Sequence, residues 1–163
     1  MTEFRLATEW RIAAEIEPVW REISDVETWP EWWPMLAGVD ALEPGDEGGL
    51  GARHRLTFRT RLPYRLSFET RVVALDRPVL LEAAIAGELA GTGRWRLAFG
   101  DGITAVRYDW NVRLTRPWMA LLAPLARPVF VWNHHEVMRA GGRGLARHLD
   151  ARLIAAGPLG GAP

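Results

Sequence analysis

Two adjacent histidines followed by a glutamate, at positions 134 to 136, form the chain's most suggestive chemical motif. A zinc-protease motif needs two histidines four residues apart on one helix face, with a glutamate next to the first. If His135 and Glu136 began such a motif, its second histidine would be residue 139, which is an arginine, Arg139. The motif therefore does not predict a zinc site, and the role of these residues depends on the elements that position them.

The long proline-free stretch after Pro128 predicts one helix from 129 to about 155. Adjacent side chains in a helix point about 100° apart, so His134 and His135 are not expected to share a metal ion. His134 falls on the apolar stripe of this helix, whereas His135 and Glu136 are expected on its solvated face. A buried structural histidine, a ligand contact and a general acid or base remain alternatives for His134. We expect no metal site.

The N-terminal part of the chain predicts one strand and two short helices. Residues 4–12 alternate between apolar and polar side chains, which is typical of a half-buried strand. Pro18 suits the start of a helix, which we expect to end before Trp29-Pro30 because a residue before proline avoids the helical conformation. Residues 31–36 allow one further turn. We expect at most two of three nearby tryptophans to be buried: Trp29, Trp32 and Trp33.

The middle of the chain predicts a series of antiparallel strands. After a glycine-rich loop, about sixty residues alternate in polarity and are interrupted by turn sequences at 75–78, 89–93 and 99–102. The Asp101-Gly102 pair in the last turn is a strong hairpin signal. One face of these strands is apolar, and the other gathers arginines. The outward arginines are Arg53, Arg55, Arg59, Arg61, Arg65, Arg71, Arg94, Arg96, Arg107 and Arg113.

These elements predict an α+β fold, with an antiparallel sheet of about seven strands wrapped around the long C-terminal helix. An amphipathic piece before that helix is expected to be separate from it, because Pro124 and Pro128 interrupt it. A length of 163 residues fits one domain. We assign this domain to 1–156 and a flexible tail to 157–163.

Composition narrows the classes of partner. The 20 basic and 20 acidic side chains cancel, although residues 1–50 hold twelve acids against three arginines. No aromatic platform interleaves with the arginine-rich strands, so no nucleic-acid partner is expected. No apolar run approaches about 18 residues, which excludes a membrane-spanning segment. The N-terminus lacks the features of a signal peptide, so we expect a cytoplasmic protein.

Two stretches carry a resemblance to a known superfamily: Asp25 to Pro34, DVETWPEWWP, and Trp132 to Leu145 in the last helix. With the order of elements, the chain resembles the START and Bet v1-like superfamily, called SRPBCC, and in particular its bacterial polyketide cyclase/dehydrase-like members. Relatives include aromatase/cyclases and lipid carriers. The resemblance implies a helix-grip fold and a hydrophobic ligand, but it provides no catalytic motif that can be transferred residue by residue.

In such a fold, a curved sheet and a long helix leave a gap that becomes an apolar cavity. Inward positions supply aromatic and aliphatic walls with few polar atoms. If the protein is an enzyme, the best candidates for catalysis are His134, Tyr108 and His54, with His54 approaching His134 across the cavity. The residues expected to bind the ligand are Trp33, His54, Phe58, Phe68, Ile85, Trp95, Tyr108, Trp110, Phe130, His134, Val137 and Met138.

We therefore expect a protein that binds an aromatic or polyketide-like hydrophobic molecule, as a carrier or as a polyketide cyclase or aromatase. The alternative is a protein-interaction module that uses the arginine-rich outer face of the sheet, with the cavity filled by its own side chains. No cofactor is expected, and a homodimer is left open.

Overall fold

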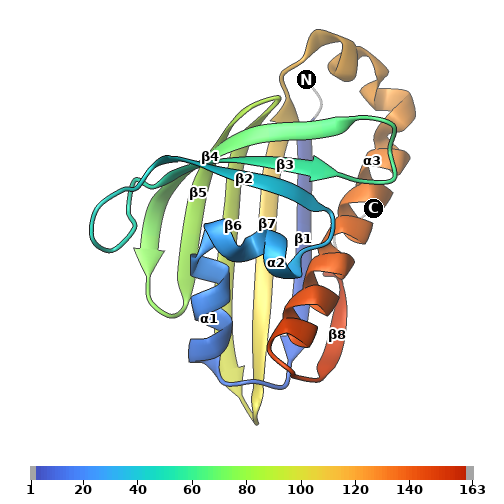
Figure 1. The fold of residues 1–163 in the computed structure, drawn as a ribbon. Helices are drawn as coiled ribbons and strands as arrows, with labels where there is room; N and C mark the ends of the chain where they lie inside the picture. The colour runs from blue at the N-terminus through green and yellow to red at the C-terminus, as the bar shows by residue number, and fades with distance from the viewer. Residues whose placement is uncertain (1–2, 161–163) are drawn as a thin grey trace.

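A computed structural model describes residues 3–160, in which one antiparallel sheet curves around a long helix (Figure 1). The helices are α1 (Ile16–Ser24), the 3₁₀ turn η1 (Val26–Thr28), α2 (Trp29–Trp32) and α3 (Pro117–His148). The strands are β1 (Glu3–Ile12), β2 (Leu36–Glu43), β3 (Arg53–Arg59), β4 (Arg65–Asp76), β5 (Leu80–Gly87), β6 (Leu89–Gly100), β7 (Ile103–Leu114) and β8 (Leu153–Pro158).

The strand order in the sheet is β2-β3-β4-β5-β6-β7-β1-β8, and all neighbours are antiparallel. The α+β helix-grip prediction is confirmed, with eight strands in place of about seven. The two strands that sequence reasoning missed, β2 and β8, form the edges of the sheet. Both have weak alternation in burial, and register shifts in their pairing with β3 and β1 interrupt the alternation.

Two of the three turns predicted in the strand region are present. The break predicted at 89–93 is wrong, because these residues belong to β6 and the chain turns earlier, at Gly87 with a φ of 109°. Asp101 and Gly102 have φ of 54° and 75°, and the flanking Gly100 and Ile103 are paired. Two successive positive φ angles are the mark of a type I′ hairpin turn, whose twist matches that of the strands it joins. The predicted turn at 75–78 joins β4 to β5.

The C-terminal helix begins and ends earlier than predicted. α3 has 32 residues, a length of about 48 Å, and it includes Pro124 and Pro128. Both prolines are exposed, and the helix bends in this region without being divided into two (Figure 1). It ends at His148 because Asp150 adopts a φ of 51°, after which the chain reverses into β8.

β8 pairs with β1 and occupies part of the region expected to be helix or tail. Trp10 of β1 lies opposite Ala156, and Thr8 lies opposite Pro158. The strand therefore includes Gly157 and Pro158, which the prediction placed in the C-terminal tail, while residues 161–163 lie outside the described range.

The short helices pack against one end of the sheet. α1 buries Val19, Trp20 and Ile23, which recur at helical spacing. Trp29 has helical backbone angles (φ −52°, ψ −38°) and begins α2 although Pro30 follows it, so the prediction that the second turn starts at 31 was wrong. A position directly before proline disfavours the helical conformation but does not forbid it when packing compensates.

Three glycines of α3 allow that helix to approach a cluster of tryptophans. A Cβ atom added at Gly141 would lie 2.6 Å from Cε2 of Trp33, and one at Gly142 would lie 2.8 Å from Cδ1 of Trp10. A Cβ at Gly144 would overlap the carbonyl oxygen of Trp32. The helical glycines are therefore close-packing positions, and each would otherwise cost about 1 kcal/mol relative to alanine.

Ion pairs within and between strands cover much of the arginine-rich outer face of the sheet. Arg53 lies 2.6 Å from a carboxylate oxygen of Glu43 and 2.7 Å from one of Glu69. Arg107 and Arg96 both pair with Asp109, at 2.9 and 3.3 Å. Most of this surface is thus a solvated face with paired charges, which is typical of an exposed antiparallel sheet.

Candidate functional site

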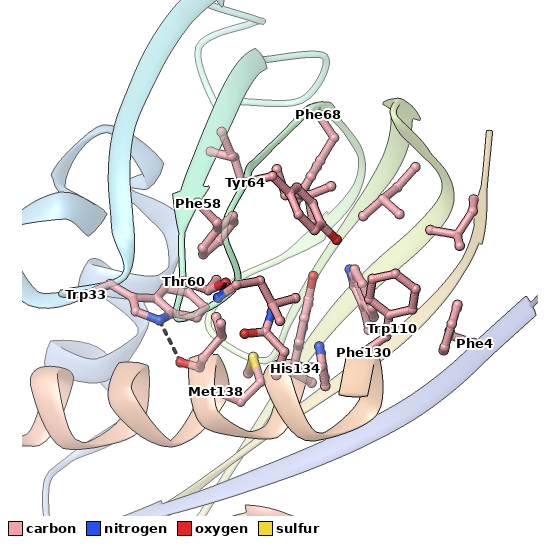
Figure 2. A pocket seen from close by; sticks show the side chains of 18 of the residues that line it. Phe4, Trp33, Phe58, Thr60, Tyr64, Phe68, Trp110, Phe130, His134 and Met138 are labelled. Atoms are coloured by element: carbon pink, nitrogen blue, oxygen red, sulfur yellow. Dashed lines mark hydrogen bonds between the residues drawn. The ribbon is translucent and has the colours of Figure 1, made fainter. Parts of the chain in front are cut away.

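The candidate site is a cavity between the concave face of the sheet and α3 (Figure 2). It holds about 900 Å³ of space, including the part that opens to solvent. Its lining is predominantly hydrophobic and aromatic, which is typical of small-molecule sites. The lining side chains are Phe4, Trp29, Trp33, Leu56, Phe58, Thr60, Leu62, Tyr64, Leu66, Phe68, Leu89, Trp95, Tyr108, Trp110, Leu114, Met119, Phe130, Asn133, His134, Val137 and Met138.

Stacked aromatic rings form the walls. The Trp95 and Tyr108 rings lie on adjacent strands with centroids 4.1 Å apart, and Phe58 stacks on Phe68 at 5.8 Å. These pairs are cross-strand neighbours or diagonal neighbours on the same face of the sheet, where aromatic side chains reach each other. The cavity therefore presents flat apolar surfaces to anything that enters it.

His134 brings one of the few polar groups to this cavity. The side chain projects from α3 and is buried, and its Nε2 atom has no hydrogen-bond partner among the described residues. Burial, with a smaller contribution from the neighbouring His135, lowers the pKa of His134 to about 3. At neutral pH the ring is therefore uncharged, so one ring nitrogen carries a proton and the other is an acceptor.

Tyr108 contributes a second polar group to the cavity, from strand β7. Its ring lies over Gly93 on the adjacent strand, where an added Cβ atom would come within 2.5 Å of the Tyr108 hydroxyl oxygen. The absence of a side chain at Gly93 gives the phenol its place in the cavity. Burial raises the pKa of Tyr108, so its hydroxyl stays protonated and can donate a hydrogen bond.

Trp33 fixes the distance between α3 and the short helices. Its indole Nε1 donates a hydrogen bond of 2.8 Å to the backbone carbonyl oxygen of Val137, shown as a dashed line in Figure 2. The ring also packs against Gly141 one turn later. Trp29, Trp32 and Trp33 are all buried, so the expectation that at most two would be buried was wrong. The glycines of α3 make the additional room.

One end of the cavity is walled by the β3–β4 loop, residues 60–64, and by the first turn of α3. Leu62 and Tyr64 contribute side chains from the loop, and Met119 contributes one from the helix. The Tyr64 ring packs edge-on against Trp118, with centroids 6.2 Å apart. Figure 2 shows the Tyr64 side chain projecting from the loop into the space between the sheet and α3.

Ten of the twelve side chains predicted to bind a ligand line this cavity. The two that do not are His54 and Ile85, which are buried elsewhere in the core region. His54 lies on β3 with its Nε2 atom 3.6 Å from a carboxylate oxygen of Glu27 in η1. His54, Thr70 and Ile85 form one cross-strand row. The cavity wall begins one row further along, with Leu56 and Phe68, so His54 does not face His134.

Eleven side chains of the wall were not among the twelve predicted ligand contacts: Phe4, Trp29, Leu56, Thr60, Leu62, Tyr64, Leu66, Leu89, Leu114, Met119 and Asn133. Leu62 and Tyr64 lie in a loop, where strand periodicity gives no signal. Met119 was assigned to a helix separate from α3. A cluster of apolar side chains in an otherwise arginine-rich turn, Leu62-Pro63-Tyr64, was the available signal for this part of the wall.

The expected division of the histidine pair holds only for His134, which faces the cavity. His135 and Glu136 are half-buried and not on a solvated face, with the Nδ1 atom of His135 buried. Glu136 pairs with Arg139 at 2.7 Å. Within residues 3–160, no three His, Asp or Glu side chains are grouped so that they could hold a metal ion. None of the helices in the described part of the chain is long and apolar enough to cross a membrane.

Solved structures share this architecture. TTHA0849 from Thermus thermophilus superposes with a TM-score of 0.72 at 16% identity, covering 89% of this chain and 99% of the other. The Zhui aromatase/cyclase from Streptomyces sp. R1128 gives 0.72 at 17% identity, covering 91% and 94%. A START superfamily protein from Mycobacterium smegmatis gives 0.67 at 18%, covering 89% and 98%. At these identities the likeness shows the fold alone.

No curated protein matches the chain. A family model does match it, over residues 3–150, which is most of its length. The chain thus belongs to the family described as polyketide cyclase / dehydrase and lipid transport.

Proposed function

We propose that this protein is a carrier for a hydrophobic molecule that combines aromatic rings with a phenol or ketone oxygen. The observation that carries the proposal is the buried Nε2 atom of His134, which has no partner in residues 3–160 and lies in the wall of a mostly apolar cavity. A buried polar atom without a partner costs about 1 to 3 kcal/mol. A ligand hydroxyl or carbonyl would supply the missing hydrogen bond.

The aromatic and uncharged walls of the cavity indicate which other features the ligand should have. Flat rings such as Trp95 and Phe58 favour stacking on an aromatic or polycyclic system. The lining contains no Arg, Asp or Glu side chain among the described residues, so a charged ligand would leave water without an ionic partner. A neutral aromatic phenol or ketone meets both conditions.

The protonation states of His134 and Tyr108 favour ligand binding over catalysis. A general base works best when its pKa lies near the working pH, whereas the pKa of His134 is lowered to about 3. Tyr108 is held in its protonated form by burial and cannot serve as a base at neutral pH either. Both groups are suited to hold a ligand by neutral hydrogen bonds. A cyclase would need a group other than these two as its general base.

The alternative of an interaction module that uses the outer sheet face receives less support. It required a cavity filled by the protein's own side chains, whereas the space between sheet and α3 remains open. Six of the ten outward arginines also lie within ion-pair distance of a carboxylate. A cytoplasmic location and a homodimer stay predictions.

The proposal is tested with two matched probes, 2-naphthol and naphthalene, titrated into the wild type and into His134→Leu. The hydroxyl of 2-naphthol can donate to the neutral imidazole, so the ratio of the two affinities should fall about three- to tenfold in the variant, the value of one neutral hydrogen bond. An unchanged ratio would show that His134 does not bind the ligand. Native mass spectrometry of the freshly purified protein should in addition reveal a co-purified neutral aromatic molecule.

A further inference from the structure

The N-terminal half of α3 carries apolar side chains on the face that points away from the protein. Their exposed fractions are 52% for Trp118, 79% for Leu121, 49% for Leu122, 87% for Leu125, 47% for Val129 and 43% for Trp132. Successive members are one, three or four residues apart, so all six fall within a stripe about 100° wide. We call this set the outer stripe of α3.

The outer stripe reverses the usual pattern of a surface helix. The opposite face of α3 is already apolar, because Met119 and Ala123 are buried and Phe130 lines the cavity. A surface helix normally turns polar residues to solvent, and soluble monomers rarely expose contiguous apolar patches larger than a few hundred Å². Side chains at 79% and 87% exposure contribute almost nothing to folding, so packing within this chain does not explain the outer stripe.

The charges beside the outer stripe are positive. Residues 116–135 contain two arginines and no acid. Next to them, at the tip of the β3–β4 hairpin, Arg59 and Arg65 lie directly opposite each other on adjacent strands. Like charges in that position repel. Both side chains are exposed, as is Arg61 between them in the loop.

Other facing arginine pairs of the sheet share a carboxylate, and this one does not. Arg53 and Arg71 face each other and both contact Glu43. Arg96 and Arg107 face each other and both contact Asp109. Within residues 3–160, no carboxylate lies within ion-pair distance of the pair at 59 and 65. Anions supplied from outside the chain would relieve this repulsion.

The same region is one end of the cavity. Tyr64 and Leu62, from the loop between the two unpaired arginines, line the cavity, and Tyr64 also packs against Trp118 of the outer stripe. Figure 1 shows the β3–β4 hairpin reaching the upper part of α3. Apolar side chains, unpaired arginines and the loop wall of the cavity therefore meet on one side of the molecule.

We propose that this side docks on an anionic lipid bilayer, with the outer stripe of α3 in the interface and the arginines of the β3–β4 hairpin on lipid headgroups. Indoles at both ends of the stripe, with leucines between them, match the preference of tryptophan for the headgroup region and of leucine for acyl chains. Lipid phosphates and carboxylates supply the missing anions. If the cavity carries a hydrophobic molecule, as proposed above, docking would direct its loop wall at the bilayer, where such a molecule dissolves.

Vesicle flotation tests the docking. The wild type should float with phosphatidylcholine vesicles that contain 30% phosphatidylserine, and at least fivefold less with pure phosphatidylcholine or in 0.5 M salt. The double variant Leu121→Glu/Leu125→Glu should float at least tenfold less. The control Val73→Glu/Phe99→Glu changes two other exposed apolar side chains, at 47% and 43% exposure, and should float like the wild type. Arg61→Gln/Arg65→Gln should lose the preference for phosphatidylserine.

Three results would overturn the docking proposal: no flotation of the wild type, equal flotation of the Leu121/Leu125 double variant, or a wild-type dimer in sedimentation that this variant dissociates while neither form binds vesicles. The last result would assign the outer stripe to a contact between two copies of the chain. Dye binding in solution separates this test from the carrier function, because the double variant leaves the cavity lining intact and should bind an apolar dye as the wild type does.

Discussion

The imidazole of His134 stacks on the indole of Trp110, with ring centroids 4.6 Å apart and ring planes 16° apart. Trp110 comes from β7 and His134 from α3, so the contact joins the sheet to the helix across the cavity wall. Stacking holds the imidazole in one orientation without using its Nε2 atom, which stays without a partner in the described chain. A polar group held in place in this way is ready for a ligand at no further cost in side-chain entropy.

Replacing His134 by leucine should leave the free energy of unfolding within about 1 kcal/mol of the wild type, or raise it. The variant loses a stacking contact worth about 0.5 to 1.5 kcal/mol, but it also removes a buried atom whose lack of a partner costs about 1 to 3 kcal/mol. Binding of 2-naphthol should weaken about three- to tenfold. Urea denaturation and a fluorescence titration measure the two quantities.

His135→Leu is the matched control, because His135 is the adjacent residue and does not line the cavity. It should change neither affinity nor stability appreciably. If His134→Leu instead destabilises the fold by several kcal/mol with unchanged affinity, His134 is a structural core residue.

As the pH is lowered, the wild type should lose stability that the His134→Leu variant keeps. An unfolded histidine has a pKa of about 6.5, whereas in the folded protein the pKa of His134 is lowered to about 3. Between these values the unfolded state binds the extra proton, so stability is fully present above pH 6.5 and is lost as pH falls toward 3. The difference between the two proteins should change by up to about 1.4 kcal/mol per pH unit.

Urea denaturation at pH 7, 6, 5 and 4 measures this difference. If the free energies of unfolding of the wild type and His134→Leu change in parallel with pH, the His134 side chain is protonated or reaches water in the folded state.

Gly144→Ala should destabilise the protein although alanine favours helices. Alanine gains about 1 kcal/mol over glycine inside a helix, but its Cβ atom would overlap the carbonyl oxygen of Trp32, which is backbone and cannot turn aside. We expect a net loss of about 2 to 3 kcal/mol. Gly38→Ala is the control, since no atom lies within 4 Å of its added Cβ. Equal stability of the two variants would show that α3 does not need its close approach to α2.

The concave face of the sheet could be predicted from the sequence because alternation along a strand reports which side chains turn inward. Phe58, Trp95 and Trp110 were placed in the wall for this reason, and they are there. Alternation does not report how far along the strand the cavity extends. His54 and Ile85 share the inward face but lie one cross-strand row outside the wall, where η1 approaches the sheet.

The ends of α3 could not be predicted because each depends on the tertiary structure. Pro124 and Pro128 interrupt helical hydrogen bonds, yet they face solvent, where water can satisfy the free carbonyls and the helix can bend. At the other end, a left-handed residue that ends a helix is commonly glycine, whereas here it is Asp150. Only the pairing of β8 with β1 explains why the chain turns there.

Titration with the neutral dye 1-N-phenylnaphthylamine tests most directly whether the space between the sheet and α3 binds an apolar aromatic molecule. The wild type should bind one dye with saturable fluorescence. Val137→Phe adds a ring at a cavity-lining position and should weaken binding at least tenfold, while Val73→Phe makes the same change at a position that is 47% exposed and should bind like the wild type. Circular dichroism melting checks that both variants fold. Absence of saturable binding in the wild type, or equal affinity of a folded Val137→Phe, would contradict the account.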